Sequence, residues 1–378
     1  MTSPDRPLRV LVAPDSFKGS LTSVQVAHAL ADGWRRARAA DDVRLAPLAD
    51  GGEGTLVAIE ASGGWSRREA DAVDPLGRPV RSAWLVRDDG GAAVVEMAAA
   101  SGLSRLEPGE RDAVRATSHG TGDLLRAVLD AGIRDIALGI GGSATTDGGA
   151  GLLRALGATI GDDLATVDLA GLDPRLGETR LRIACDVTNP LLGPDGAAAT
   201  YGPQKGATPD LVPVLDARLA RFADALETAT GRRARDLPGA GAAGGIGFGL
   251  LCMAGRFAGL ELRPGVDLVM EEAGFDAALA GAGLVITGEG RIDAQTAFGK
   301  TALGVAGRAQ AARVPCVAVG GGVTPEGIAA LATVGAVAVP VTEVPQSVEQ
   351  AMAAGPAPLE RCGERIARLV SLGGIIAS

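Results

Sequence analysis

Three lysines are the first candidates for chemistry, because the chain otherwise uses arginine for its positive charges. Lysine and arginine together number 36, and lysine occurs only as Lys18, Lys205 and Lys300. Each lies in a glycine-bounded segment that should form a loop. A compact ammonium suits a site that needs a point charge and no planar fork. Chance is the alternative for any single lysine, but the three together indicate loops that bind anions.

Acidic residues follow the predicted strands. They are Asp15, Asp50, Glu53, Asp186, Glu289 and Asp293. In open α/β sheets ligands bind at the carboxyl ends of the strands, and carboxylates there can hold Mg²⁺ or accept a hydroxyl proton. A single aspartate at a strand end is alternatively a helix cap. Because the chain has only two histidines, this set favours phosphoryl transfer with Mg²⁺ over a histidine-rich metal site.

A glycine-rich segment, residues 141–149, follows a predicted strand and opens a predicted helix. Glycines let backbone N–H groups approach an anion closely, and a helix start adds a positive dipole. Neither the P-loop pattern nor the usual dinucleotide fingerprint is present. The segment predicts a phosphate-binding loop, with a plain helix start as the alternative. Its donors would be Gly141, Gly142, Ser143, Thr145 and Thr146.

The rarest polar residues lie near one another in the sequence. Asn189 is the only asparagine and Tyr201 is the only tyrosine. Taken alone, the asparagine is a turn residue before proline, and the tyrosine is a loop residue that covers apolar surface. Their closeness to Asp186 and Lys205 favours a shared site instead.

The elements that must position these residues alternate between strand and helix at both ends of the chain. Apolar runs predict strands at 8–13, 43–48, 135–140, 181–185, 284–287, 314–319 and 336–340. Helical spacing predicts a helix opened by a capping box at Thr22 and Gln25, and helices at 123–131, 150–156, 213–228, 325–333 and about 347–370. Turn signals at 74–79 and 88–91 predict antiparallel hairpins between them.

This pattern predicts two α/β domains. Residues 1–65 and 283–378 should form one discontinuous domain with a largely parallel sheet. Residues 66–282 should form an inserted α/β domain with a mixed sheet. The chain length of 378 residues suits two domains of ordinary size.

Composition narrows the class of protein. The chain is 47% hydrophobic and carries a formal charge of −9, which argues against disorder and against nucleic acid as the main partner. The four cysteines form no paired motif, so we expect reduced, buried thiols. The first residues lack the apolar core of a signal peptide, and no apolar run approaches the ~20 residues of a membrane helix. We therefore expect a cytoplasmic protein with no membrane partner; its oligomeric state is open.

Several motifs together resemble the bacterial type I glycerate kinases. They lie at residues 13–20, 50–55, 141–149, 185–192, 201–206 and 288–293. Each glycine-rich piece alone would be weak, but the set spans most of the chain. The resemblance implies ATP-dependent phosphorylation of D-glycerate at its 2-hydroxyl, giving 2-phosphoglycerate. It also implies an active site in a cleft between two α/β domains.

The residues at the matched positions can be given separate roles in catalysis and binding on chemical grounds. We expect Asp50 to accept the hydroxyl proton and Lys18 to neutralise developing charge. The loop donors and Lys205 would bind the phosphates of ATP. We assign glycerate to Ser16, Asn189 and Lys300, and Mg²⁺ to Glu289, Asp293 and Asp186.

The sequence leaves other functions open. Phosphorylation of the 3-hydroxyl, or of another small hydroxy acid, would use the same residues. A noncatalytic two-domain protein that binds an anionic metabolite is a reading from another class. A dehydrogenase is disfavoured because the dinucleotide fingerprint is missing.

Overall fold

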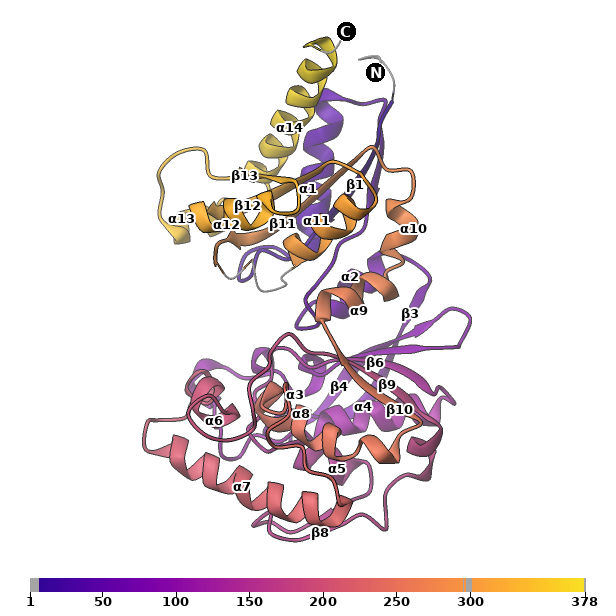
Figure 1. Cartoon of the computed structure of the whole chain (residues 1–378), viewed down its shortest axis with the longest axis vertical. Helices are drawn as coiled ribbons and strands as arrows, with labels where there is room; N and C mark the ends of the chain where they lie inside the picture. Colours follow the sequence, from indigo (N-terminus) through magenta and orange to yellow (C-terminus); the bar gives the residue numbers. More distant parts are fainter. Residues whose placement is uncertain (1–6, 295, 297–300, 377–378) are drawn as a thin grey trace. The chain divides into compact units, whose positions relative to one another are not determined.

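The computed structural model describes residues 7–294, 296 and 301–376 (Figure 1). The chain forms two compact units. Unit 1 comprises residues 1–50, 57–63 and 269–378, and unit 2 comprises residues 51–56 and 64–268. The predicted fold class is confirmed, because both units are α/β, one is discontinuous with a parallel sheet, and the other is inserted with a mixed sheet.

Unit 1 contains a five-stranded sheet in the order β13-β12-β11-β1-β2, with every neighbouring pair parallel. Parallel sheets are covered on both faces, which explains why these strands are apolar runs. The strands are β1 (Arg9–Pro14), β2 (Asp42–Leu45), β11 (Leu284–Ile292), β12 (Cys316–Val323) and β13 (Ala336–Pro340). Two predicted strand ends are wrong, because β11 and β12 continue through residues that we expected to be loops.

Helices α1 (Ser23–Ala37) and α14 (Ala357–Ile376) pack together on one face of this sheet (Figure 1). The predicted capping box at Thr22 and Gln25 opens α1. The two helices approach closely at Gly33, where a Cβ atom would lie 1.8 Å from Glu360 O. The other helices of unit 1 are α10 (Phe275–Leu279), α11 (Thr301–Ala311), α12 (Pro325–Ala332) and α13 (Val348–Ala353), while α2 (Thr55–Ala61) and α9 (Gly265–Glu272) carry residues of both units.

The C-terminal helix predicted at about 347–370 is wrong as one element. The chain instead forms two helices, α13 and α14, with a short non-helical segment between them. Gly355 adopts φ +63° in the interruption, a left-handed conformation that a regular helix excludes. The break separates α13 from α14 at the edge of the pocket described below.

Unit 2 contains a six-stranded sheet in the order β10-β9-β6-β5-β4-β3. The predicted hairpins are confirmed, since β4 pairs antiparallel with both β3 and β5, while β5, β6, β9 and β10 are parallel. The strands are β3 (Trp65–Val73), β4 (Pro79–Arg87), β5 (Ala93–Glu96), β6 (Asp135–Gly139), β9 (Arg180–Ala184) and β10 (Gly259–Arg263). Short strands β7 (Thr159–Ile160) and β8 (Val167–Asp168) form a separate pair.

The helices of unit 2 enclose a large apolar core that contains Leu138, Leu152, Phe222 and Phe248. They are α3 (Ala98–Ser101), α4 (His119–Asp130), α5 (Ala150–Ala155), α6 (Ala197–Tyr201), α7 (Leu211–Thr230) and α8 (Ala242–Cys252).

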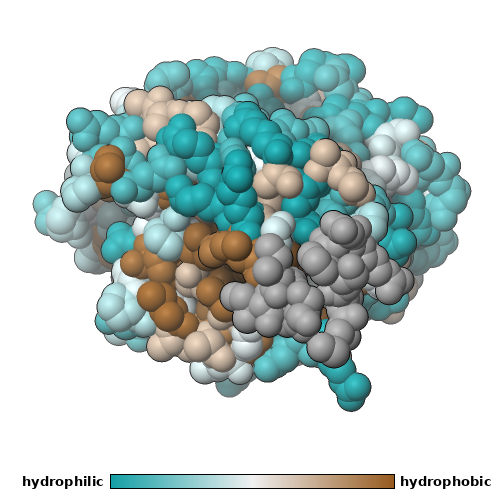
Figure 2. Space-filling model, turned by 90° about the horizontal axis from the view of Figure 1, so that it is seen from above, coloured by the Kyte–Doolittle hydropathy of each residue, from teal (hydrophilic) through white to brown (hydrophobic). Residues whose placement is uncertain are grey.

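The surface seen in Figure 2 is mostly hydrophilic, with hydrophobic residues gathered in limited areas. Within the described residues, we find no helix that combines the length and the apolar character needed to span a bilayer. The four cysteines are free thiols, and three of them are buried.

Candidate active site

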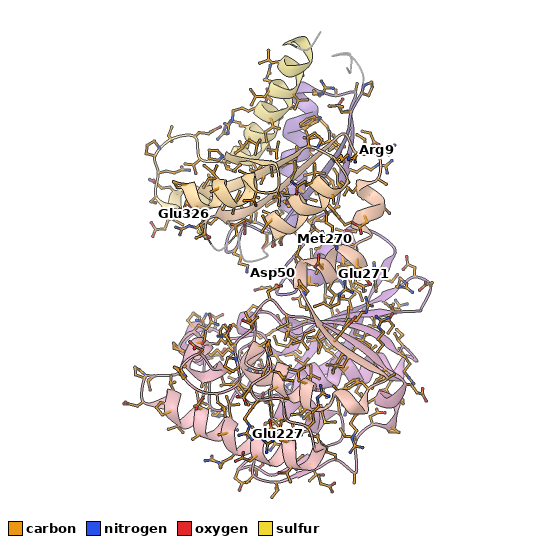
Figure 3. The ribbon with its side chains drawn as sticks, viewed as in Figure 1. Arg9, Asp50, Glu227, Met270, Glu271 and Glu326 are labelled. Atoms are coloured by element: carbon orange, nitrogen blue, oxygen red, sulfur yellow. The ribbon has the colours of Figure 1, made fainter. Side chains whose placement is uncertain are left out.

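Lys18 and Asp50 form an ion pair at the carboxyl edge of the unit 1 sheet. Lys18 Nζ lies 3.1 Å from Asp50 Oδ2, and 79% of the Lys18 side chain is exposed. Figure 3 shows Asp50 on the segment that follows β2. The charge of Asp50 is the main cause of the raised pKa of Lys18, and Asp15 and Glu289 raise it further. The structure thus brings together the two residues that we expected to carry catalysis.

Asp15, one of the acidic residues expected after a strand, belongs to the same group. It is only 8% exposed and directly follows β1. Its Oδ1 accepts a hydrogen bond from Ser16 N at 2.5 Å, and its Oδ2 accepts one from Thr301 Oγ1 at 2.6 Å. Burial raises the pKa of Asp15, and the charge of Asp50 adds to that rise. Ser16, predicted to bind glycerate, lies next to this carboxylate.

Glu289 lies inside β11 and not in a loop, which corrects the sequence prediction. It is paired in register with Gly320 of β12 and is 7% exposed. Glu289 Oε1 accepts a hydrogen bond from Thr296 Oγ1 at 2.8 Å. The strand continues because β12 also extends and supplies partners as far as Val323. A strand position holds the carboxylate more rigidly than a loop would.

The other two predicted metal ligands have different surroundings. Asp293 Oδ2 lies 3.1 Å from Arg291 Nε, just after β11. Asp186 belongs to unit 2, where its Oδ1 accepts a hydrogen bond from Gly265 N at 2.7 Å. In the part of the chain that the structure describes, no three His, Cys, Asp or Glu side chains form a group able to hold a metal ion. The assignment of Mg²⁺ to Glu289, Asp293 and Asp186 stays a prediction.

A pocket of about 690 Å³ opens in unit 1 beside these residues. One side of it carries the chemistry-bearing groups. Its polar lining includes Asp15, Ser16, Lys18, Asp50 and Glu289. The sheet edge thus presents three carboxylates and one ammonium to a single space, as expected for a ligand site at the carboxyl ends of parallel strands.

The glycine-rich segment of unit 2 connects β6 to α5, as predicted. Gly142 has φ +77°, and Gly149 has φ +85° directly before α5. Asp147 fixes the end of this loop, because Asp147 Oδ2 accepts hydrogen bonds from Ser118 N at 2.9 Å and Ser118 Oγ at 2.8 Å. Gly141 N donates to Gly51 O at 3.2 Å, and Gly51 directly follows Asp50. The loop is therefore held at both ends.

Lys205 lies beneath this loop and is almost completely buried, with 1% of the residue exposed. Lys205 Nζ donates to Ser143 Oγ at 2.7 Å and to Thr145 O at 2.6 Å. Burial lowers its pKa to about 7, and the charge of Asp147 opposes that change. Lys205 is thus bonded inside the protein, and its contact with ATP phosphates stays a prediction.

The hydroxyl groups of Thr145 and Thr146 are buried and have no hydrogen-bond partner among the described residues. Gly244 packs against the same loop in a left-handed conformation with φ +67°. A Cβ atom at Gly244 would lie 1.8 Å from Thr145 O and 2.9 Å from Lys205 Nζ. Among the described residues, these two threonine hydroxyl groups are loop donors that internal contacts do not use.

Asn189 and Tyr201 contact each other, as their rarity and closeness suggested. Tyr201 Oη donates to Asn189 Oδ1 at 2.7 Å, and Asn189 Nδ2 donates to Asp195 O at 2.8 Å. The Asn189 amide therefore uses both its ends to hold the chain after β9. Lys300, the remaining predicted glycerate ligand, lies outside the described residues.

Sequence reasoning also missed Glu96, a buried carboxylate at the end of β5. Glu96 Oε2 accepts a hydrogen bond from Leu56 N at 3.0 Å, and burial raises the pKa of Glu96. The signal for this residue was a single glutamate at the end of an otherwise apolar strand. It anchors the start of α2, close in sequence to Asp50.

Comparisons with known proteins agree with these features. Residues 10–371 match the model of the glycerate kinase family. A glycerate kinase of Bacillus subtilis (strain 168) is 44% identical over 331 residues, covering 84% of this chain and 86% of the relative. A glycerate 2-kinase of Escherichia coli (strain K12) is 41% identical over 331 residues, covering 84% and 86%.

A solved structure is similar along nearly the whole chain. It is a crystal structure provisionally identified as glycerate kinase 2 from Salmonella typhimurium LT2, with a TM-score of 0.82 and 39% identity. The match covers 97% of this chain and 99% of the solved chain. The chain therefore belongs to the glycerate kinase family and is a phosphotransferase.

Proposed function

We propose that this protein transfers the γ-phosphoryl group of ATP to the 2-hydroxyl of D-glycerate, giving 2-phosphoglycerate and ADP. The observation that carries the proposal is the Lys18–Asp50 ion pair, 3.1 Å long, in a pocket that Asp15 and Glu289 also line. The name of the Escherichia coli relative, a glycerate 2-kinase, supports the choice of hydroxyl group. Because ATP is the proposed phosphoryl donor, we infer that the reaction takes place in the cytoplasm.

The proposed step forms one bond and breaks one. The glycerate hydroxyl oxygen bonds to the γ-phosphorus, the bond to the ADP oxygen breaks, and the hydroxyl proton passes to Asp50. A carboxylate is basic enough because a loose transition state needs little early deprotonation. Lys18 keeps its proton, since neighbouring carboxylates raise its pKa, and its charge offsets the negative charge of the phosphoryl group.

The donor set fits Mg²⁺, which prefers hard oxygen ligands, retains several waters and needs only one or two carboxylates. Glu289 would supply one carboxylate, with Asp293 or Asp186 as further ligands. When bound, the ion would neutralise charge on the phosphate oxygens. Thr296 would orient Glu289 through its 2.8 Å hydrogen bond.

We assign the phosphates of ATP to the loop of unit 2. Its backbone N–H groups and hydroxyl groups would bind the phosphate oxygens, and Lys205 would support the loop from beneath. The donors are Gly141, Gly142, Ser143, Thr145 and Thr146. We assign glycerate to Ser16, Asn189 and Lys300. A location of the active site between the two domains stays a prediction.

The test is ATP consumption with and without D-glycerate, followed by identification of the product by phosphorus and carbon NMR. We expect glycerate-dependent formation of ADP and of 2-phosphoglycerate. Formation of 3-phosphoglycerate would contradict the proposed position of transfer. Turnover only with another hydroxy acid would contradict the substrate, and binding of glycerate without any ATP consumption would indicate a noncatalytic binding protein.

A further inference from the structure

The pocket of unit 1 has a second, apolar side that the proposed transfer does not use. Its carboxylates come from the middle and one edge of the sheet, at β1, β11 and the segment after β2. The opposite edge, at β12 and β13, supplies apolar residues together with α13. The apolar residues are Val323, Val341, Val348 and Met352, and the neighbouring Thr324, Thr342 and Ser347 also line the pocket.

Two glycines of β12 leave part of the apolar side without side chains. Gly321 and Gly322 of β12 line the pocket, and a Cβ atom at Gly321 would lie 3.6 Å from Phe17 Cε2. The Phe17 ring therefore lies near the bare backbone of β12 and also lines the pocket. A flat ligand could pack here against an aromatic ring, aliphatic side chains and exposed peptide groups.

Size and polarity decide which substrate this side suits. Glycerate is a small molecule that carries a carboxylate and two hydroxyl groups, so it has almost no apolar surface to bury. A pocket of about 690 Å³ with an apolar wall exceeds what glycerate needs. A nucleotide fits better, because its base is flat and partly apolar while its ribose and phosphates are polar.

We propose that the apolar side of this pocket binds the adenine ring of ATP. The assignment rests on the proposed function, because it presumes that ATP is the phosphoryl donor. Three carboxylates, Lys18 and Arg291 line the polar side of the pocket, so the adenine ring belongs on the apolar side. Gln346 at the rim offers an amide that could bond the edge of the base.

Gly322→Trp tests the site, because an indole there would occupy the space of the adenine. A Cβ atom at Gly322 would meet nothing closer than Arg291 Cγ at 3.9 Å, so the strand should tolerate the change. Val337→Trp is the matched control, since Val337 is an exposed residue of the neighbouring strand β13 and does not line the pocket. The probes are ADP and tripolyphosphate, each with Mg²⁺, and the readout is the Kd from calorimetry.

We expect Gly322→Trp to raise the Kd of ADP about tenfold or more, as loss of an apolar pocket should. Tripolyphosphate, which has no base, should keep its Kd within about twofold. Val337→Trp should change neither. Unchanged ADP affinity in Gly322→Trp, or equal losses for both probes, would overturn the adenine site.

A second variant covers the case in which the tryptophan prevents folding. Met352→Glu changes a partly exposed side chain and places a charge on the apolar side, so it should also weaken ADP binding selectively. The two proposals fail separately. A wild-type protein that binds ADP but does not phosphorylate glycerate contradicts the proposed function alone. Glycerate phosphorylation combined with normal ADP affinity in both pocket variants contradicts the adenine site alone.

Discussion

Lys18 Nζ and Asp50 Oδ2 lie 3.1 Å apart, although 32 residues separate them in the chain. Strands β1 and β2 are parallel neighbours, so the segments that leave them turn at the same sheet edge. The lysine is largely exposed while its partner is half-buried. An exposed ion pair contributes only about 0–1 kcal/mol to stability, so its place beside the pocket points to chemistry more than to folding.

Lys18→Ala should lower kcat by about 10²-fold or more, because the phosphoryl group loses its nearest cation. The melting temperature should change little, since the ammonium is exposed. Arg308→Ala is the matched control, because Arg308 forms a 2.8 Å surface ion pair with Asp276 in the same unit. Steady-state kinetics that show near-normal turnover in Lys18→Ala would remove the lysine from the mechanism.

Gly142→Val should raise the KM for ATP about tenfold or more, because valine blocks close approach to the loop and is strained at φ +77°. Gly90→Val separates the two effects. Gly90 has φ +75° in the turn between β4 and β5, and a Cβ atom there meets nothing within 4 Å. Both variants should lose similar stability in thermal unfolding, and only Gly142→Val should affect ATP. If both variants have the wild-type KM, the loop is a helix start and no more.

Glu289→Gln should raise the Mg²⁺ concentration needed for half-maximal rate about tenfold, because an amide is a weaker ligand than a carboxylate. Glu326→Gln is the control, since Glu326 lies in the first turn of α12, also in unit 1 (Figure 3). The measurement is the initial rate across a Mg²⁺ titration at saturating ATP. An unaltered requirement in Glu289→Gln would show that another group holds the ion.

The buried Lys205 predicts a particular pH dependence of stability. Its pKa falls from an ordinary value of 10.5 to about 7 in the folded protein. Between these pH values the unfolded chain holds the proton and the folded chain does not, so its contribution to the free energy of unfolding rises with pH. This contribution does not rise with pH below pH 7, where Lys205 is protonated in both the folded and the unfolded chain.

Lys205→Met should remove this rise while leaving other groups to titrate as before. It should also weaken ATP binding, because Ser143 and the Thr145 carbonyl lose their donor. Urea unfolding of both proteins from pH 6.5 to 9.5 makes the comparison. Parallel stability curves for the two proteins would mean that Lys205 keeps its proton throughout.

Local sequence patterns predicted most of the fold, because buried strands and amphipathic helices have clear periods. The capping box at Thr22 and the hairpin turns are set by nearby residues, so they could be predicted. The ends of β11 and the interruption at Gly355 could not. Glycines after Thr287 look like a loop, and only pairing with an equally long β12 makes them a strand.

The candidate site, too, could be predicted only in part from the sequence. Rare residue types indicated Lys205, Asn189 and Tyr201, and the structure places Asn189 and Tyr201 in contact. Their partners depend on tertiary packing, which no local pattern encodes. The sequence therefore did not reveal that Lys205 is bound from within by Thr145 O, or that Asp15 joins Asp50 beside Lys18.

The most direct test of the proposed catalytic pair is kcat for Asp50→Asn with D-glycerate and saturating Mg²⁺ and ATP. The amide keeps the shape of the side chain but cannot accept the hydroxyl proton, so kcat should fall by about 10²-fold or more while the KM for ATP stays close to wild type. A kcat near wild type would contradict the role of Asp50. A shifted Mg²⁺ requirement would make it a metal ligand instead.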